Sequence, residues 1–589
     1  MELKMTILYG SETGTAQDTA EQIWKSAKRN GIKCFVTAMD DYEIAKLTEE
    51  RLVIFVVATT GQGDPPKNMT KFWRLLLRKT LPAKCLENVK YAVLGLGDSS
   101  YKKYNFAAKK LNRRLAQLGA KEIQAIGLAD DQHDLGIDAV VDPWTQNLWR
   151  IISKEFNVKL DYSEHSDHEI IERFEVNIVQ EEIDNLEQNR DIFRLEVELN
   201  KELRIGKILE NIRTTSEDHF QDVRLIKFHC NNVNYSPGDI LYVKPRNSPK
   251  QVANFFNLLM HHGIALGPET LISVKEKEIK VPAALKQILT LKEIVEQYWD
   301  LSFKPRRSTM QVLASISEDE LEKEKLHEFT LPAGQEELFS YVNRPRRNIL
   351  EVLGDFPHTA RKLSLKILFE IMSPIKPRAF SIASSCEENR NEIHLLVAVV
   401  KYKTKLVEPR LGLCSNWLAT LKPGEEIIFS IQKGTFKFTY GKPMILIGPG
   451  TGVAPFRSLL LQQSHLNANL ADTVLFFGCR NKHKDYHCRK DFESIRKNND
   501  LRVFCAFSRD QEEKIYVQHV IQKERQLCWE LLERGGSIYL SGSSKNMPKC
   551  VRDEFVAVAR DLGKLTETEA EKFIEKLEKD GRYQEETWG

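Results

Sequence analysis

Residues 1–150 alternate short apolar runs with segments of helical periodicity, and this alternation constrains the fold of the chain more than any other feature. The apolar runs read "MTILY", "RLVIFVVATT", "YAVLGLGDSS" and "IQAIGLADD". Alternation of this kind predicts a multidomain α/β protein whose first domain is a parallel sheet with helices on both faces. A ligand of such a sheet binds beyond the carboxyl ends of the strands, where the strand order reverses.

Three polar loops follow the predicted strands of this domain, at residues 11–16 ("SETGTA"), 58–63 ("ATTGQG") and 96–105 ("LGDSSYKKYN"). The first opens a helix, so its free N–H groups and the helix dipole favour an anion. It lacks the lysine of a triphosphate-binding loop, which favours a single phosphate. The other two loops would enclose a ring, with Tyr101 or Tyr104 stacked on it. A merely capped helix explains one such loop, but three loops at successive strand ends favour a ligand.

The predicted contacts of this first site are Ser11, Glu12, Thr13, Gly14, Thr15, Ala16, Ala58, Thr59, Thr60, Gly61, Leu96, Gly97, Asp98, Ser99, Ser100, Tyr101, Lys102, Lys103, Tyr104 and Asn105.

Residues 151–195 are predicted to be a linker, because most of this segment is polar and charged. Alternation typical of strands resumes at "IFRLEVEL" and continues through "DVRLIKFHC" and "YSPGDILYVKP", with a turn at Pro237-Gly238-Asp239. Residues 196–440 are therefore predicted to form a β-barrel, interrupted by a helical insertion at about 250–370.

Two motifs of the barrel, "KPRAFSIASS" and "EPRLGLCSNWL", suggest a second ligand site. Arg378 and the aromatic that follows could bind an anion and line a ring, and Gly412 opens a helix that suits a pyrophosphate. A plain barrel strand with an exposed arginine explains the first motif equally well. The predicted contacts are Arg378, Ala379, Phe380, Ser381, Gly412, Leu413, Cys414 and Ser415.

Residues 441–589 begin with "PMILIGPGTGVAPFRSLL", which reads as a strand, a glycine-rich turn containing Thr451, and a helix. Such a turn lets the backbone approach a dinucleotide pyrophosphate. Further on, "SRDQEEKIYVQ" gathers hydroxyls and two cations, which suit the extra phosphate of NADPH, whereas an NADH site would carry an acid. A charged surface loop is the alternative. The predicted contacts here are Ser508, Arg509, Lys514, Tyr516 and Gln518.

Composition narrows the class of protein further. The formal net charge of +3 does not indicate nucleic-acid binding, and the ten cysteines include no C-x-x-C pair, so we predict reduced thiols and no metal site. The N-terminus does not resemble a signal peptide, and no apolar run approaches the roughly 20 residues of a membrane span. We therefore expect a cytoplasmic chain without a membrane anchor.

The first three loops resemble those of flavodoxins, and the whole ordered set of motifs resembles the diflavin reductase family. This resemblance implies a flavodoxin-like FMN domain, an FAD-binding barrel and a Rossmann-like NADP-binding domain. It adds Asp131 as a neighbour of the FMN ring and Arg346 as a further cofactor contact. Thr60 departs from the family pattern, because relatives often place an aromatic residue there.

The resemblance also implies catalytic roles for Ser381, which should lie near the reactive FAD nitrogen, and for Trp588, which should stack on the FAD ring. Two more predicted catalytic positions depart from better-known relatives: Ser541 replaces a cysteine and Glu586 replaces an aspartate. The implied function is electron transfer from NADPH through FAD and FMN to an anamorsin-type iron–sulfur protein in cytosolic cluster assembly. A haem or cobalamin enzyme as acceptor is the alternative, and a binding protein that keeps its flavins without catalysis is the rival of another class.

Six cations in or after the third FMN loop suggest a docking surface for an acidic acceptor, although a solvated helix face explains them as well. They are Lys102, Lys103, Lys109, Lys110, Arg113 and Arg114.

Overall fold

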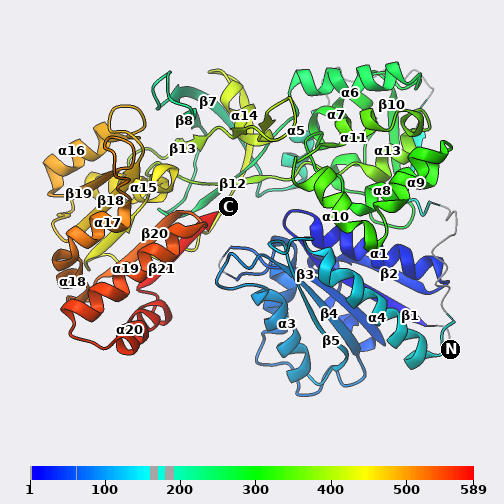
Figure 1. The fold of residues 1–589 in the computed structure, drawn as a ribbon, viewed down its shortest axis with the longest axis horizontal. Helices are drawn as coiled ribbons and strands as arrows, with labels where there is room; N and C mark the ends of the chain where they lie inside the picture. Colours follow the sequence, from blue (N-terminus) through cyan, green and yellow to red (C-terminus); the bar gives the residue numbers. More distant parts are fainter. Residues whose placement is uncertain (1–2, 62, 160–169, 180–190, 589) are drawn as a thin grey trace. The chain divides into compact units, whose positions relative to one another are not determined.

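The computed structural model describes residues 3–61, 63–159, 170–179 and 191–588. These form two compact units (Figure 1). The first unit comprises Met1–Asn189, Ser248–Pro374 and Thr404–Leu406, and the second comprises Arg190–Asn247, Ile375–Lys403 and Val407–Gly589. The predicted linker 151–195 lies partly outside the described residues.

The first unit begins with the predicted parallel sheet, whose strand order is β2-β1-β3-β4-β5. Apolar side chains fill both of its faces, because helices cover each side. The order reverses between β1 and β3, the point at which a ligand is expected. The strands and helices are β1 Lys4–Gly10, α1 Thr15–Arg29, β2 Lys33–Ala38, β3 Leu52–Ala58, α2 Thr70–Leu76, β4 Lys90–Gly97, α3 Phe106–Gln117, β5 Lys121–Asp130 and α4 Asp138–Phe156.

The remainder of the first unit is largely helical, as predicted for the insertion. A small antiparallel sheet of order β11-β10-β6 accompanies the helices. These elements are β6 Phe174–Ile178, α6 Pro249–His261, β10 Leu271–Glu276, β11 Leu289–Thr290, α7 Leu291–Gln297, α8 Arg307–Ile316, α9 Glu320–Glu328, α10 Gln335–Leu338, α11 Ile349–Asp355, α12 Pro357–Ala360 and α13 Leu365–Ile371.

A buried group of four charges connects α1 to the helical part of this unit. The Glu370 carboxylate accepts from the backbone N–H of Arg173 at 2.7 Å and from Lys25 Nζ at 2.9 Å. The guanidinium of Arg173 also lies 3.3 Å from Glu21. Burial raises the pKa of Glu370, but Arg173 and Lys25 more than offset it, so the net pKa lies below its usual value. Mutual pairing makes the burial of these charges possible.

The second unit contains a six-stranded antiparallel sheet of order β12-β9-β16-β7-β8-β13. A bridge between Ile382, just after β12, and Leu395, in the middle of β13, joins the two edge strands and closes the sheet into the predicted barrel. Its elements are α5 Ile192–Leu199, β7 Arg204–Arg213, β8 Val223–His229, β9 Ile240–Lys244, β12 Arg378–Ser381, β13 Glu392–Ala398, β14 Lys401–Tyr402, β15 Arg410–Leu411, α14 Leu413–Thr420 and β16 Glu426–Gln432.

One predicted strand of this barrel is wrong. "IFRLEVEL" forms helix α5, which begins where Asp191 accepts a hydrogen bond from the backbone N–H of Phe193 at 2.9 Å. Adjacent Ile192 and Phe193 are both buried, and the ring of Phe193 packs against the cations of Lys244 and Arg246. The N-cap and this packing outweigh the alternating pattern.

The second unit ends in a parallel sheet of order β19-β18-β17-β20-β21. Figure 1 shows it among α15 to α20. Its elements are β17 Met444–Ile447, the short 3-10 turn η7 Gly450–Val453, α15 Ala454–His465, β18 Thr473–Cys479, α16 Arg489–Asn499, β19 Arg502–Phe507, α17 Val517–Lys523, α18 Arg525–Glu533, β20 Ser537–Ser543, α19 Asn546–Leu562, α20 Glu567–Lys579 and β21 Tyr583–Trp588.

Candidate functional site

The predicted phosphate loop lies between β1 and α1. Gly14 adopts a φ of 96°, a left-handed conformation that favours glycine, and caps the helix. Ser11 Oγ accepts from the N–H of Gly14 at 3.1 Å, and the Ser11 N–H donates to Asn68 at 2.8 Å. Glu12, predicted as a cofactor contact, accepts from the Lys67 N–H at 3.0 Å. The loop is therefore held in shape from outside, and the first turn of α1 presents its N–H groups to an anion.

The second loop, after β3, is fixed against the third. The Thr59 N–H donates to the Leu96 carbonyl at 3.1 Å, and Thr59 Oγ1 accepts from the Ala107 N–H at 3.3 Å. Thr60 donates from its N–H and from its hydroxyl to the Asp64 carbonyl, in the turn that follows the strand. Because β1, β3 and β4 are neighbours in the sheet, their three loops share one edge.

The two tyrosines of the third loop that could stack on a ring differ in their contacts. The Tyr104 hydroxyl donates to the Leu128 carbonyl at 2.6 Å, whereas the side chain of Tyr101 forms no hydrogen bond within the described part of the chain. Tyr101 is therefore the better placed of the two to stack on a ring. Asn105 is buried, and its Oδ1 has no partner among the described residues. An unpartnered buried acceptor beside these loops fits a bound polar group.

Asp130 and Asn68 support these loops, and the sequence did not single them out. The Asp130 carboxylate accepts from the N–H groups of Ser99 at 2.8 Å and Gln132 at 3.0 Å. Asp131, the predicted ring neighbour, donates its N–H to the Gly97 carbonyl at 2.8 Å. Asp130 precedes Asp131 directly in "GLADDQ", and this pair of acids is the sequence feature from which a role of Asp130 could have been predicted.

The second site brings two predicted catalytic residues into contact. Ser381 Oγ, at the end of β12, donates to Glu586 Oε1 at 3.0 Å, although 205 positions separate them in the chain. Thr435 Oγ1 donates to the other carboxylate oxygen at 3.1 Å. Burial raises the pKa of Glu586, and these hydrogen bonds only partly oppose the increase. The pair is a half-buried proton-holding group that ends at the Ser381 hydroxyl.

The other motif of this site forms the start of α14. Gly412 allows a close approach to Val400, and Ser415 Oγ accepts from the Val400 N–H at 3.0 Å. Cys414 is buried, which raises the pKa of its thiol to about 12, while Arg378 opposes the shift. Arg346 lies in the first unit with a φ of 54°.

The glycine-rich turn packs directly on β20. A Cβ added to Gly452 would lie 2.2 Å from the Ser541 carbonyl oxygen, and one added to Gly448 would lie 2.8 Å from the ring of Phe456. Ser541 is fully buried, and its hydroxyl has no hydrogen-bond partner within the described part of the chain. Trp588 ends β21 opposite Ser543 and is 39% exposed. An orphan hydroxyl beside a close-packed turn fits a dinucleotide with its reactive ring near Ser541.

The five predicted phosphate contacts lie after β19. Ser508 is buried, whereas the side chains of Arg509, Lys514 and Tyr516 are exposed. Tyr516 precedes α17, whose second residue is Gln518. Exposed cations and a hydroxyl at the carboxyl end of a parallel strand fit a terminal phosphate.

Among the described helices, none combines the length and the apolar composition needed to cross a membrane. Three domain models match in the predicted order: flavodoxin at residues 7–144, FAD-binding domain at 198–417, and oxidoreductase NAD-binding domain at 446–553. Together with the geometry above, this order defines an oxidoreductase of the diflavin class, and the domains support the predicted cofactors FMN, FAD and NADPH.

The chain is similar over 99% of its length to curated proteins named NADPH-dependent diflavin oxidoreductase 1. It is 44% identical to the protein from Xenopus laevis, 41% to that from Mus musculus and 35% to that from Schizosaccharomyces pombe, with 99% of each relative covered. The chain belongs to this family of NADPH-dependent diflavin oxidoreductases, which confirms the predicted family.

We expect Glu586→Gln to slow reduction by NADPH about a hundredfold, because the amide cannot hold the proton that the carboxyl holds. The raised pKa of Glu586 means that the folded state holds this proton more tightly than the unfolded state. The wild-type protein therefore loses stability as the pH rises above 4.5, the ordinary pKa of a glutamate. The variant should lack this loss. Stopped-flow rates and melting temperatures across pH test both effects, and Thr435→Val serves as a milder control. A variant that keeps the wild-type pH profile of both would contradict the role of Glu586.

Proposed function

We propose that this protein transfers electrons from NADPH through FAD and FMN to an anamorsin-type iron–sulfur protein in the cytoplasm, in the service of cluster assembly. The observation that carries the reductase part of the proposal is the contact between Ser381 and Glu586 in the second unit. Bound flavins accept a hydride and release single electrons, and the protein supplies binding, orientation and a proton-holding group.

The chain's own residues divide the work. The loop at residues 11–16 binds a phosphate through the start of α1, and the glycine-rich turn η7 brings a dinucleotide against β20. Ser381 Oγ orients the group that receives the hydride, and Glu586 holds or releases the accompanying proton through that hydroxyl. Trp588, at the end of the edge strand β21, would cover a bound flavin ring and exclude water from it.

A surface of four cations supports an acidic acceptor. Lys103, Lys109, Lys110 and Arg113 are exposed around the start of α3, and none of them forms an ion pair with another described residue. We call these four residues the basic surface. Arg114 does not belong to it, because it is half-buried and its guanidinium donates to the carbonyls of Leu76 and Arg78. Lys109 Nζ donates to the Tyr104 carbonyl at 3.1 Å and Lys110 lies over the ring of Phe106, but both side chains stay exposed. Exposed cations that no described carboxylate neutralises can steer an oppositely charged protein toward the neighbouring FMN loops.

The direct test uses the full chain loaded with FMN and FAD. NADPH is added anaerobically to catalytic amounts of this holoprotein together with an anamorsin-type iron–sulfur protein, and the visible absorbance of the cluster is followed. Bleaching of the cluster at a rate that saturates with the acceptor supports the proposal. Parallel reactions contain a haem monooxygenase or a cobalamin enzyme, and faster reduction of either one would overturn the proposed acceptor. Flavins that NADPH does not bleach would instead favour a binding protein.

The basic surface makes a separate prediction. Reversing the charges of Lys109, Lys110 and Arg113 to Glu should lower the association rate with the acceptor about tenfold at low salt. The difference in association rate between the variant and the wild type should disappear at about 0.5 M salt, because salt at that concentration screens the attraction between the two proteins. The matched control reverses the exposed Lys572, Lys576 and Lys579 of α20, which changes the net charge equally. Equal slowing in both variants, or none in the first, would show that the basic surface does not guide the acceptor.

A further inference from the structure

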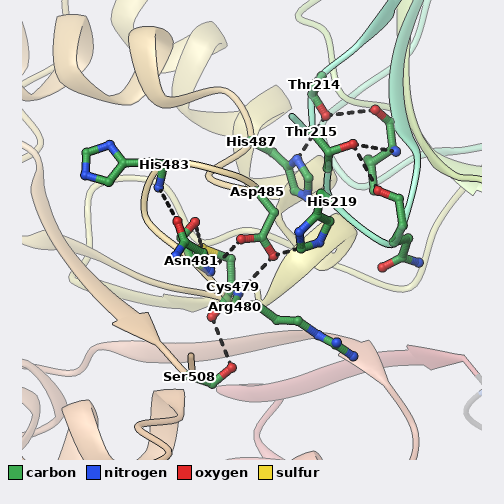
Figure 2. Close-up of polar contacts among 12 residues, drawn as sticks. Thr214, Thr215, His219, Cys479, Arg480, Asn481, His483, Asp485, His487 and Ser508 are labelled. Carbon is green, nitrogen blue, oxygen red and sulfur yellow. Dashed lines mark hydrogen bonds and ion pairs between the residues drawn. The ribbon is translucent and has the colours of Figure 1, made fainter. Parts of the chain in front are cut away.

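The loop that follows β18 closes on a buried aspartate. The Asp485 carboxylate accepts hydrogen bonds from the backbone N–H groups of Arg480 at 2.9 Å and Asn481 at 2.6 Å. Figure 2 shows this carboxylate between those two residues and the ring of His219, whose Nε2 lies 3.7 Å from Oδ2. The Asp485 side chain is only 10% exposed. Buried bonds from N–H groups to a carboxylate are among the stronger hydrogen bonds in proteins.

The same two peptide groups hold the end of the neighbouring strand β19. The carbonyl of Cys479 accepts from the Ser508 N–H at 3.0 Å, and the carbonyl of Arg480 accepts from the Arg509 N–H at 2.8 Å. The peptide between Cys479 and Arg480 therefore donates to Asp485 on one side and binds Ser508 on the other. The next peptide connects Asp485 to Arg509 in the same way. Each oxygen of the Asp485 carboxylate is thus connected through one peptide group to the backbone N–H of either Ser508 or Arg509. Hydrogen bonds aligned in a chain of this kind polarise each other.

The barrel of the same unit holds this loop from the other side. Thr214 Oγ1 and His487 Nδ1 lie 2.9 Å apart, and the Ser216 N–H donates to the Lys484 carbonyl at 2.9 Å. Figure 2 shows Thr214 beside His487. The carboxylate is thereby held between two parts of the second unit, the barrel and the parallel sheet, so it can fix the two peptide groups in one arrangement.

We propose that Asp485 is a positioning residue for the 2′-phosphate of NADPH. The inference rests on the proposed function of Ser508 and Arg509 as phosphate contacts, and it assigns to Asp485 the task of placing them. Asp485 itself does not touch the coenzyme in this scheme. Loss of the Asp485 carboxylate should weaken the binding of coenzymes that carry the 2′-phosphate and leave the binding of coenzymes without it unchanged.

The test compares Asp485→Asn and Asp485→Ala in the flavin-loaded full chain, with Glu493→Gln as the matched control. Glu493 lies on α16 and forms an exposed ion pair with Arg489. Isothermal titration with 2′,5′-ADP and with 5′-AMP measures binding without turnover, and steady-state kinetics give KM and kcat for NADPH and NADH.

We expect Asp485→Ala to weaken 2′,5′-ADP binding and to raise KM for NADPH about tenfold to a hundredfold. Asp485→Asn should have a smaller effect, because its amide oxygen still accepts one N–H bond. The affinity for 5′-AMP, KM for NADH and both kcat values should stay within about twofold of wild type. The control variant should behave like wild type.

Arg509→Ala separates this inference from the phosphate assignment on which it rests. If Arg509→Ala leaves NADPH binding unchanged, the assignment fails. If Arg509→Ala weakens NADPH binding but the folded variants Asp485→Asn and Asp485→Ala do not, the phosphate assignment stands and the positioning role of Asp485 is wrong. Equal weakening of 2′,5′-ADP and 5′-AMP would also overturn it, since a general loss of structure would affect both. Flavin content and melting temperature establish that each variant is folded.

Discussion

Replacing Thr13 by Asp is expected to remove FMN from the protein while FAD stays bound. Thr13 is exposed within the loop at residues 11–16, so the substitution should not disturb the fold. It would place a negative charge beside the phosphate that the start of α1 is expected to bind. At about 4 Å, two like charges repel by about 4 kcal/mol near a protein surface. This energy corresponds to a loss of affinity of roughly a thousandfold.

The measurement is the ratio of FMN to FAD released from purified protein. Thr13→Val provides the neutral control and should lose much less FMN, because it removes a hydroxyl without adding charge. The melting temperature of the flavin-free forms checks that both variants fold alike. A Thr13→Asp protein that retains one FMN for each FAD would place the phosphate elsewhere.

Replacing Trp588 by Ala should allow NADH to compete with NADPH. In the proposed arrangement, nicotinamide would have to displace the ring of Trp588 before it could reach the flavin, and stacking of an aromatic side chain on a base is worth about 1–3 kcal/mol. The two coenzymes share the nicotinamide, but only NADPH has a 2′-phosphate whose contacts offset the displacement. Without the ring, the ratio of kcat/KM for NADH to that for NADPH should rise roughly tenfold to a hundredfold.

Substitution is a better test than truncation for this residue. The Trp588 carbonyl accepts from the Ser544 N–H at 2.8 Å, and β21 carries Glu586 into its contact with Ser381. Removal of the backbone would therefore disturb a second functional group. Trp588→Phe is the control and should keep most of the preference for NADPH. An unchanged coenzyme ratio in Trp588→Ala would contradict the gating role.

Much of this architecture could be predicted because it depends on local signals. Apolar runs separated by helical segments predict parallel sheets, and glycines such as Gly14 and Gly452 occur where the backbone must turn or approach another strand. The sequence therefore indicated the loops, the three domains and their order. The alternating pattern failed at Ile192–Leu199, where an N-cap and burial of adjacent apolar residues favour a helix.

Contacts between distant segments were not predictable in the same way. Thr435 binds Glu586, and Asp485 binds the loop behind Ser508, yet neither residue belongs to a recognisable motif. Such partners depend on how separate elements pack, and a polar residue in a loop gives no local sign that it will be buried. The residues that touch a ligand are thus easier to predict than the residues that place them.

The four buried charges around Arg173 limit how freely the first sheet could be exchanged between proteins. A free-standing flavodoxin grafted onto this chain would bring its own first helix, without the carboxylate of Glu21 and the ammonium of Lys25. Arg173 and Glu370 would then lose partners inside the protein, at a cost of about 3–5 kcal/mol. The first sheet and the distant helix that carries Glu370 therefore depend on each other, and a chimaera that exchanges only one of the two segments should be less stable than the parent protein.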